Sequence, residues 1–293
     1  MTHRDCPDRR EYGTRNYCKI IYEYTSRELT FESDRLDAIK GVFRGTTGSH
    51  DGVLLKTGLP LKSFGLALTW SLNPEMNTKR RTPVSGIPSW SWASAGRPVH
   101  YETRLHDHDG EHAAMDLFAY ETAGNPNHIL GRAISGFQWH LKGVPLNPTA
   151  IDSLVKSLVL DPDPAIPIIY LVTVGFHAYL KPAVREMDCG WTYRITNFSH
   201  AEEDIECTDH LSGGIIVDEK RFGRVNITRR WCFAVVWVTR RYRSDTLIFW
   251  TLALRKAGGY FKRVGIAALS DSRFRKLLRS RGADPRCTYI KLR

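Results

Sequence analysis

Apolar residues follow a helical period in the first part of the chain. Leu36, Ile39 and Phe43 recur at i, i+3 and i+7 after Ser33, a residue type that can cap a helix. The glycine and threonine residues that follow end the pattern. The sequence therefore predicts a helix over about 34–44.

A second helix is predicted to begin near Pro60, because the fixed φ angle of proline suits the first turn of a helix. Its apolar stripe consists of Leu61, Phe64, Leu68 and Leu72, joined by Trp70. Gly65 interrupts this stripe. Further upstream, residues 19–24 fit either one turn of helix or a short strand.

Short β-rich runs follow one another at hairpin spacing in the second half of the chain. They cover residues 166–174, 176–180, 191–198, 214–217, 231–239, 246–254, 260–269 and 287–292. Residues 231–238 and 247–254 are apolar at both parities, which predicts strands covered on both faces. We expect these two runs to pair as a central antiparallel hairpin.

A late helix is predicted from Ser270 to about Arg281, between the last two β runs. Its apolar face consists of Phe274, Leu277 and Leu278, and Gly282 ends it. The opposite face is basic, with Arg273, Arg275, Lys276, Arg279 and Arg281. Such a face can bind phosphate-rich surfaces, and it is also typical of an ordinary solvated helix.

These elements predict an α+β protein. A partly helical N-terminal segment is followed by a mostly antiparallel β sandwich or barrel-like domain with one late helix. The turn-forming sequence Asp-Pro-Asp-Pro at 161–164 is the best candidate for a boundary between two domains. We therefore expect one domain over residues 1–160 and a second over 161–293.

Charge and cysteine content narrow the functional classes. The formal net charge is +11, and from residue 255 onward twelve Lys and Arg stand against two Asp. No run of about 18 apolar residues exists, and the N-terminus lacks the apolar core of a secretory signal. The six cysteines show no C-x-x-C spacing. We expect a cytoplasmic protein with reduced thiols and no transmembrane segment.

Candidate catalytic and metal-binding residues are sparse. Four histidines fall at positions 100–112 beside acidic residues, and His106, His108 and His112 are the candidate metal ligands. Their spacing fits no established zinc signature, and a polar surface loop explains them equally well, so no metal is predicted. The chain has no G-x-S-x-G elbow and no phosphate-binding glycine motif. The sequence predicts no catalytic residue, no cofactor and no enzymatic activity.

The most unusual local sequence is Gly-Ile-Pro-Ser-Trp-Ser-Trp-Ala-Ser at 86–94. Trp90 and Trp92 have the same parity, so an extended segment would place both indoles on one side. We predict that both are buried where the helical segment meets the β domain. The alternative is an exposed aromatic platform for a ligand.

This motif, with Gly96 and Val99 after it, resembles the P-S-W-S-W-A-S/G signature of fungal heterokaryon-incompatibility (HET) proteins. The matching residues are Pro88, Ser89, Trp90, Ser91, Trp92, Ala93 and Gly96. Residues 24–41 are similar to the family's Y-S-x-R-x-L-T…D-x-L-x-A-x-x-G stretch. The sequence Gly-Leu-Pro at 58–60, followed by Phe64, Leu68 and Trp70, continues the likeness. Residues 259–265 resemble the aromatic-x-R-x-G strand that closes the same region.

The resemblance implies a fungal protein of non-self recognition, and specifically the region C-terminal to the HET domain. In such proteins the HET domain lies upstream, has a fold similar to TIR domains and is linked to cell death. It does not lie within these 293 residues, so no catalytic residue is inherited. The resemblance implies an accessory or recognition role with protein partners in incompatibility signalling. Two alternatives stay open: binding of nucleic acid or acidic surfaces through the basic helix, and a metal-dependent enzyme using the histidines at 100–112.

Overall fold

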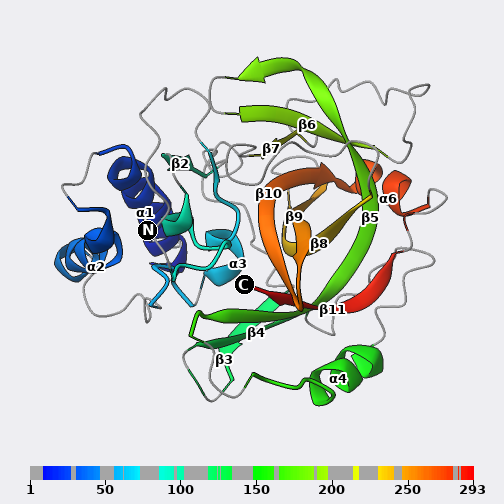
Figure 1. Cartoon of the computed structure of the whole chain (residues 1–293), viewed down its shortest axis with the longest axis horizontal. Helices are drawn as coiled ribbons and strands as arrows, with labels where there is room; N and C mark the ends of the chain where they lie inside the picture. Colours follow the sequence, from blue (N-terminus) through cyan, green and yellow to red (C-terminus); the bar gives the residue numbers. More distant parts are fainter. Residues whose placement is uncertain are drawn as a thin grey trace, which may run out of the picture.

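The protein is an α+β structure in which the N-terminal helices lie to one side of a large, mostly antiparallel sheet (Figure 1). The computed structural model describes residues 9–27, 31–46, 56–61, 63–72, 86–95, 98–101, 118–123, 125, 127–133, 148–161, 165–187, 190–196, 214–217, 230–240, 246–279, 283 and 285–293. Every structural statement below concerns these residues. The predicted fold class is confirmed.

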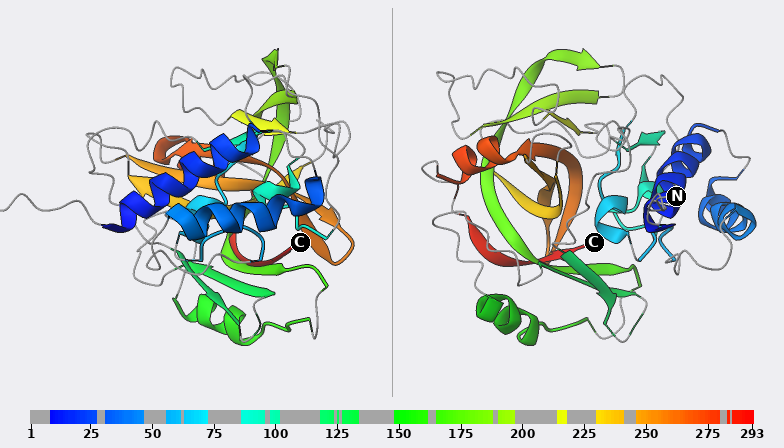
Figure 2. Two further views of the ribbon diagram at one scale, coloured as in Figure 1. Left: turned by 90° about the vertical axis from the view of Figure 1, so that its left-hand side faces the viewer. Right: turned by 180° about the vertical axis from the view of Figure 1, so that it is seen from behind.

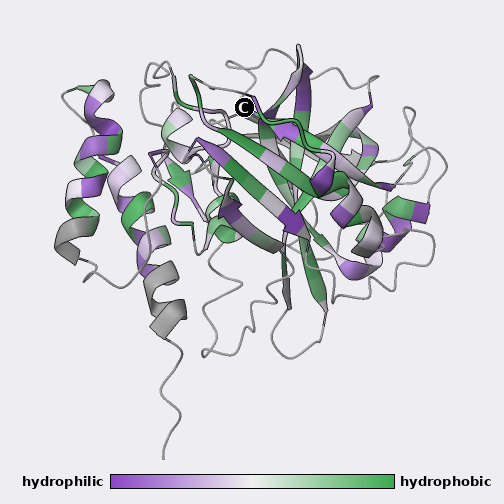
Figure 3. Cartoon of the chain, turned by 90° about the horizontal axis from the view of Figure 1, so that it is seen from below, coloured by the Kyte–Doolittle hydropathy of each residue, from purple (hydrophilic) through white to green (hydrophobic). Residues whose placement is uncertain are grey.

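Two helices, α1 (Arg9–Thr25) and α2 (Arg35–Thr46), lie beside each other at the N-terminal side of the molecule (Figure 2). Helix α2 confirms the helix predicted over 34–44, and the short 3-10 turn η1 (Glu32–Asp34) leads into it. In α1 the buried residues Tyr17, Ile21 and Tyr24 follow helical spacing. Polar and apolar residues alternate around both helices (Figure 3).

The next segment connects these helices to the sheet. It contains α3 (Phe64–Ala67), β1 (Ser71–Leu72), the 3-10 helix η2 (Trp92–Ser94) and β2 (Val99–His100). Strands β1 and β2 pair antiparallel. The helix predicted from Pro60 is therefore much shorter than its apolar stripe suggested. Leu72, at the end of that stripe, belongs to β1 instead.

The large sheet contains β3 (Phe118–Thr122), β4 (His128–Ala133), β5 (Ile168–Met187), β8 (Trp231–Arg240), β9 (Leu247–Ala257), β10 (Tyr260–Ser270) and β11 (Arg286–Leu292). Their order is β11-β10-β9-β8-β5-β4-β3, and β11 also pairs with β5. The pairings β5-β8-β9-β10-β11 thus close a five-stranded barrel. Strands β6 (Gly190–Thr196) and β7 (Gly214–Val217) extend from the far end of β5.

The predicted central hairpin is confirmed. Strand β8 pairs antiparallel with β9, and each has a second neighbour, β5 and β10. Alternate residues of β9 lie in two different apolar clusters: Trp250 and Leu252 in one, Phe249 and Ala253 in the other. Both faces of the strand are therefore covered, as the continuous apolar run predicted.

Strand β5 joins two runs that the sequence separated at Gly175. A Cβ atom at this glycine would lie 2.5 Å from Cγ2 of Thr288, so the residue permits the close approach of β11. The other predicted runs correspond to β6 to β11, with ends that differ by a few residues. Strands β3 and β4 and helix α4 (Pro148–Lys156) were not predicted.

The expected domain boundary at residue 161 runs through a continuous sheet. Strand β4, before the boundary, pairs in parallel with β5, after it. The largest apolar cluster likewise draws residues from α1, α2 and α3 and from β8, β9 and β11. The ranges 1–160 and 161–293 therefore share both a sheet and a core.

Helix α6 (Asp271–Arg279) is the predicted late helix, and it connects the parallel strands β10 and β11. Its apolar residues Phe274, Leu277 and Leu278 are buried, as expected. The ring of Phe274 stacks on Phe249 of β9 with centroids 4.2 Å apart. This helix covers one face of the strands, whereas the N-terminal segment covers the other.

Candidate functional site: the tryptophan joint

The tryptophan motif folds as a turn followed by the 3-10 helix η2, and not as an extended segment. Ser91 caps this helix, because its Oγ accepts a hydrogen bond from the N–H of Ala93 at 3.1 Å. The same hydroxyl donates to the main-chain oxygen of Thr57 at 2.7 Å. Consequently the two indoles do not share one side of a strand, and each has its own surroundings.

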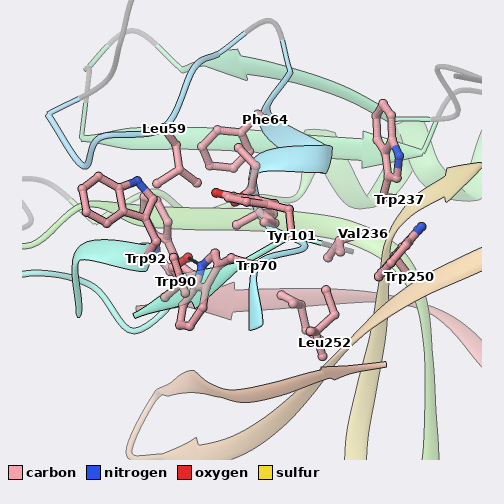
Figure 4. Close-up of a cluster of buried hydrophobic side chains, with 14 of the residues drawn as sticks. Leu59, Phe64, Trp70, Trp90, Trp92, Tyr101, Val236, Trp237, Trp250 and Leu252 are labelled. Atoms are coloured by element: carbon pink, nitrogen blue, oxygen red, sulfur yellow. Dashed lines mark hydrogen bonds between the residues drawn. The ribbon is translucent and has the colours of Figure 1, made fainter. Parts of the chain in front are cut away.

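Trp90 is fully buried and contacts α3. Its indole meets the ring of Phe64 edge-on, with centroids 5.7 Å apart. Its main-chain oxygen accepts a hydrogen bond from Nε1 of Trp70 at 2.9 Å. Among the described residues, the indole N–H of Trp90 has no hydrogen-bond partner. Its role therefore rests on packing (Figure 4).

Trp92 is equally buried but is also anchored by a hydrogen bond. Its Nε1 donates to the main-chain oxygen of Gly58 at 3.1 Å, and its ring meets Tyr24 of α1 edge-on. Gly58 has a φ of +80°, and a Cβ there would lie 3.0 Å from the indole. A glycine is thus needed both for the backbone conformation and for the close approach of Trp92.

Arg35 connects the motif to α2. It is buried, and its Nη1 donates to the main-chain oxygens of Ala93 at 2.7 Å and Ala95 at 2.9 Å. The main-chain oxygen of Arg35 in turn accepts a hydrogen bond from the hydroxyl of Tyr24 at 2.7 Å. A buried guanidinium is tolerated where carbonyl oxygens accept its hydrogens. The end of η2 is therefore fixed to both N-terminal helices.

Arg263 and Ser89 connect the motif to the barrel. Arg263 of β10 is buried, lies over the ring of Trp70 at 3.6 Å, and donates from Nη2 to the main-chain oxygen of Trp70. The hydroxyl of Ser89 accepts from the N–H of Arg263 at 3.0 Å and donates to the main-chain oxygen of Arg293 at 2.5 Å. Residues distant in sequence thereby meet in one buried cluster, which we call the tryptophan joint: Tyr24, Arg35, Gly58, Phe64, Trp70, residues 88–95 and Arg263.

The predicted burial of both tryptophans at this junction is confirmed, and the exposed aromatic platform is excluded. Both side chains have 0% exposure. The hydroxyls of Ser89, Ser91 and Ser94 all bond to main-chain groups. The joint therefore arranges its polar groups to hold the backbone in place. Gly96 lies outside the described residues.

Sequence reasoning did not identify Arg35 or single out Arg263 as parts of this cluster. A signal for Arg35 was present, because it lies four and eight residues before Ile39 and Phe43, on the apolar face of α2. Arg263 similarly lies two residues after Phe261, so both belong to the covered face of β10. In both elements an arginine occupies a position that the apolar pattern assigns to the buried face.

The histidine candidates are not brought together in the described part of the chain. His100 lies in β2, where its Nδ1 is 3.3 Å from Oγ of Ser71. His106, His108 and His112 lie outside the described residues. Among the residues that the structure describes, no group of three or more His, Cys, Asp or Glu could hold a metal ion.

The basic face predicted for α6 is smaller than its sequence suggested. Arg273 is buried, which corrects its placement on the solvated face. Nε of Arg275 lies 2.8 Å from Asp271 in an ion pair within the helix. Lys276 and Arg279 are exposed, and Arg281 lies outside the described residues. Of the four cations of this face that the structure describes, two are exposed.

The cysteine thiols among the described residues are free, namely Cys18, Cys232 and Cys287. Burial raises the pKa of the Cys18 thiol to about 12 and that of Cys232 to about 11. Both side chains therefore stay protonated and poorly nucleophilic at neutral pH.

Comparisons with known proteins identify no relative: no family model, curated protein or solved structure matches the chain. Within the described residues, no helix is long and apolar enough to cross a membrane.

Proposed function

We propose that this chain is the accessory or recognition region of a HET-type incompatibility protein. In this proposal it belongs to a fungal protein of non-self recognition, acts in the cytoplasm through protein partners, and has no catalytic activity of its own. The effector chemistry resides in a HET domain that such proteins carry upstream.

The proposal rests on one observation: the stretches that resemble HET proteins meet in the tryptophan joint. The resemblance rests on four separate stretches, at 24–41, 58–70, 86–96 and 259–265. Each stretch contributes a residue to the joint through a hydrogen bond or ring contact. A shared set of residues that pack together is what a common fold requires, so the likeness is supported as more than a chance match of one motif.

The arrangement of the joint favours a scaffold role over catalysis. Its tryptophans, serines and arginines are buried, and the serines, the arginines and Trp92 bond to main-chain groups, so they present no surface to a substrate. Recognition then belongs to surfaces that the joint holds in position. The described residues add no support for either alternative: His100, the one candidate histidine that the structure describes, contacts Ser71, and the described part of α6 exposes two cations.

An expression experiment in a fungal host tests the proposal. The chain alone should cause no growth arrest, whereas the same chain fused behind a HET domain should do so when its non-self partner is present. The matched control is the fusion carrying Trp92→Ala, which disrupts the joint and should abolish the response. Growth arrest caused by the chain alone would place the effector in this region and overturn the proposal.

A biochemical assay addresses the absence of activity directly. Purified chain is incubated with NAD, the expected substrate of a TIR-like effector, and release of nicotinamide is followed against a heat-inactivated sample. We expect no difference between the two. Turnover above the inactivated control would contradict the assignment as a non-catalytic region.

A further inference from the structure

Three cations lie in one row formed by β9, β10 and the residue that follows β11. Lys262 of β10 is directly opposite Arg255 of β9 in the antiparallel register. On its other side, Phe261 pairs with Leu292 of β11, and the N–H of Arg293 donates to the oxygen of Phe261. This pairing brings Lys262 and Arg293 side by side. Since neighbouring strands are about 4.8 Å apart, the row Arg255–Lys262–Arg293 spans roughly 10 Å.

A second row, one step along the strands, contains tyrosines and a lysine. Tyr260 of β10 lies beside Lys291 of β11, which is opposite Tyr170 of β5. The ammonium of Lys291 is 4.8 Å from the ring centre of Tyr260, and the guanidinium of Arg293 is 5.3 Å from the same ring. Asp161 binds both Lys291 and Tyr260, at 2.5 and 2.8 Å.

The side chains of the first row are accessible to solvent, and the repulsion between their charges destabilises the fold. Lys262 is exposed, and Arg255 and Arg293 are half-buried. Like charges directly opposite on paired strands destabilise a sheet, and no Asp or Glu side chain belongs to this row. Arg255 also has an interaction within the protein, so an anionic ligand would share its guanidinium with that interaction. An anionic ligand would relieve the repulsion that remains.

We propose that this cationic row binds the phosphodiester backbone of a single-stranded nucleic acid. Successive phosphates would contact Arg255, Lys262 and Arg293, and the half-buried ring of Tyr260, 5.3 Å from the guanidinium of Arg293, lies next to them for base contact. Cations beside aromatic side chains on a sheet are typical of single-strand binding. The proposal goes beyond the function proposed above and differs from binding through α6.

A lipid surface fits the same charges less well. Membrane binding of this kind combines cations with exposed apolar side chains. In the described segment that leads from α4 to Asp161, Val159 is the exposed large apolar residue. A single valine offers little apolar area for insertion into a membrane. The experiment therefore includes acidic lipid as a second ligand.

The test measures fluorescence anisotropy of a labelled oligothymidylate of about 12 nucleotides, within the usual site size. The row variant is Arg255→Gln/Lys262→Gln/Arg293→Gln. The matched control is Lys19→Gln/Lys276→Gln/Arg279→Gln, which removes as many positive charges from exposed positions on α1 and α6. The whole chain is used throughout, with titrations at several salt concentrations and parallel titrations with phosphatidylserine vesicles.

We expect the wild type to bind with a log–log salt slope of about −2, from three contacts of about −0.7 each. The row variant should bind about tenfold more weakly or worse, with a slope near zero, and the control should stay within about twofold. The single variant Lys262→Gln, at an exposed strand position, should reduce the slope by about 0.7, which keeps the test valid if the triple variant does not fold.

Several outcomes would overturn the proposal. Equal losses in both triple variants would mean that net charge alone drives binding. A loss confined to the control would place the site on α1 or α6. Row-dependent binding to vesicles without binding to the oligonucleotide would assign the row to lipid headgroups, and no binding by the wild type would remove the site.

Discussion

The two tryptophans of the joint are equally buried yet differ in polar anchoring. Trp92 donates its indole hydrogen to the main-chain oxygen of Gly58, whereas the indole N–H of Trp90 has no partner among the described residues. Truncation of either removes a large packed ring, but a change that keeps the ring and removes the N–H should distinguish them.

We expect Trp90→Ala and Trp92→Ala each to lower the free energy of unfolding by about 3–5 kcal/mol, because each leaves a large cavity in the joint. Urea denaturation of purified variants measures this loss. The matched control is Tyr22→Ala on α1, because Tyr22 is 38% exposed and its truncation should cost less than about 1 kcal/mol. Losses below about 1 kcal/mol for both tryptophans would show that the joint is not a stabilising centre.

Phenylalanine substitutions separate packing from hydrogen bonding. Trp92→Phe should cost about 1 kcal/mol more than Trp90→Phe, because it also removes the hydrogen bond to Gly58. The same denaturation experiment, run on both variants under identical conditions, gives the difference. Equal losses would mean that the indole hydrogen bond contributes nothing measurable.

Asp161 and Lys291 couple stability to pH. The hydrogen bond from Lys291 lowers the pKa of the Asp161 carboxyl, and the bond from Tyr260 adds to this effect. Burial is the largest single effect on Lys291 and lowers its pKa, but the hydrogen bond to Asp161, the charge of Asp161 and the neighbouring tyrosines together raise that pKa above its ordinary value. A lowered carboxyl pKa stabilises the fold above the ordinary value near 3.9, and this contribution is lost as the pH falls through the folded pKa.

We therefore expect Asp161→Asn to be less stable than the wild type by about 1 kcal/mol near neutral pH, and this gap should close below about pH 4. Denaturation over a pH series measures it. Asp37→Asn is the control, because Asp37 pairs with Lys40 on the exposed side of α2. A gap that stays constant into acid would show that the ion pair is not its cause.

Elements in the second half of the chain were predictable because their strands carry long apolar runs. Strands β8 and β9 are covered on both faces, so nearly every position is apolar and the pattern is unambiguous. Helix α1 was not recognised as a long helix, because its many charged and polar residues obscure a stripe of Tyr17, Ile21 and Tyr24. Strand β3 lies at the edge of the sheet and is short, which leaves a weak pattern.

The joint was predictable as a motif but not as a network. Two tryptophans in a fixed context indicated a buried staple, and both are buried. The partners come from contacts across 20 to 204 positions of sequence, such as Trp70 with Trp90 and Ser89 with Arg293. Local periodicity can place Arg35 and Arg263 on a buried face but contains no information on their partners, which emerged from the structure alone.

Glycine positions in two helices give a matched test of packing between elements. A Cβ at Gly65 of α3 would lie 2.3 Å from the indole of Trp237 on β8, whereas a Cβ at Gly41 of α2 would meet nothing within 4 Å. Gly65→Ala should therefore destabilise the protein by about 1–3 kcal/mol. Gly41→Ala should stabilise it by about 0.4–1 kcal/mol. Thermal unfolding of both variants decides whether α3 packs on β8 as closely as described.

For the whole molecule, the central question is whether the N-terminal segment and the barrel are separate folding units. The largest apolar cluster contains Ile21 and Ile39 from the helices together with Leu252 and Ile290 from the barrel. Arg263 and Ser89 add hydrogen bonds across the same contact. Loss of either part would expose the apolar face of the remaining part to water. This exposure is unfavourable by about 25 cal/mol for each Å² of apolar surface.

We therefore predict one cooperative unfolding transition for the full chain. Far-UV circular dichroism, which reports on the helices and strands, should coincide with tryptophan fluorescence, which reports on the joint. A fragment of residues 161–293 should not fold alone, because it keeps β5 to β11 but lacks the segment that covers Trp250 and Leu252. Adding back a fragment of residues 1–160 serves as the control, since complementation should restore part of the structure if the shared core is the cause. Two separated transitions in the full chain, or a fragment with its own sigmoidal unfolding curve, would show that the boundary at residue 161 divides independent domains despite the sheet that crosses it.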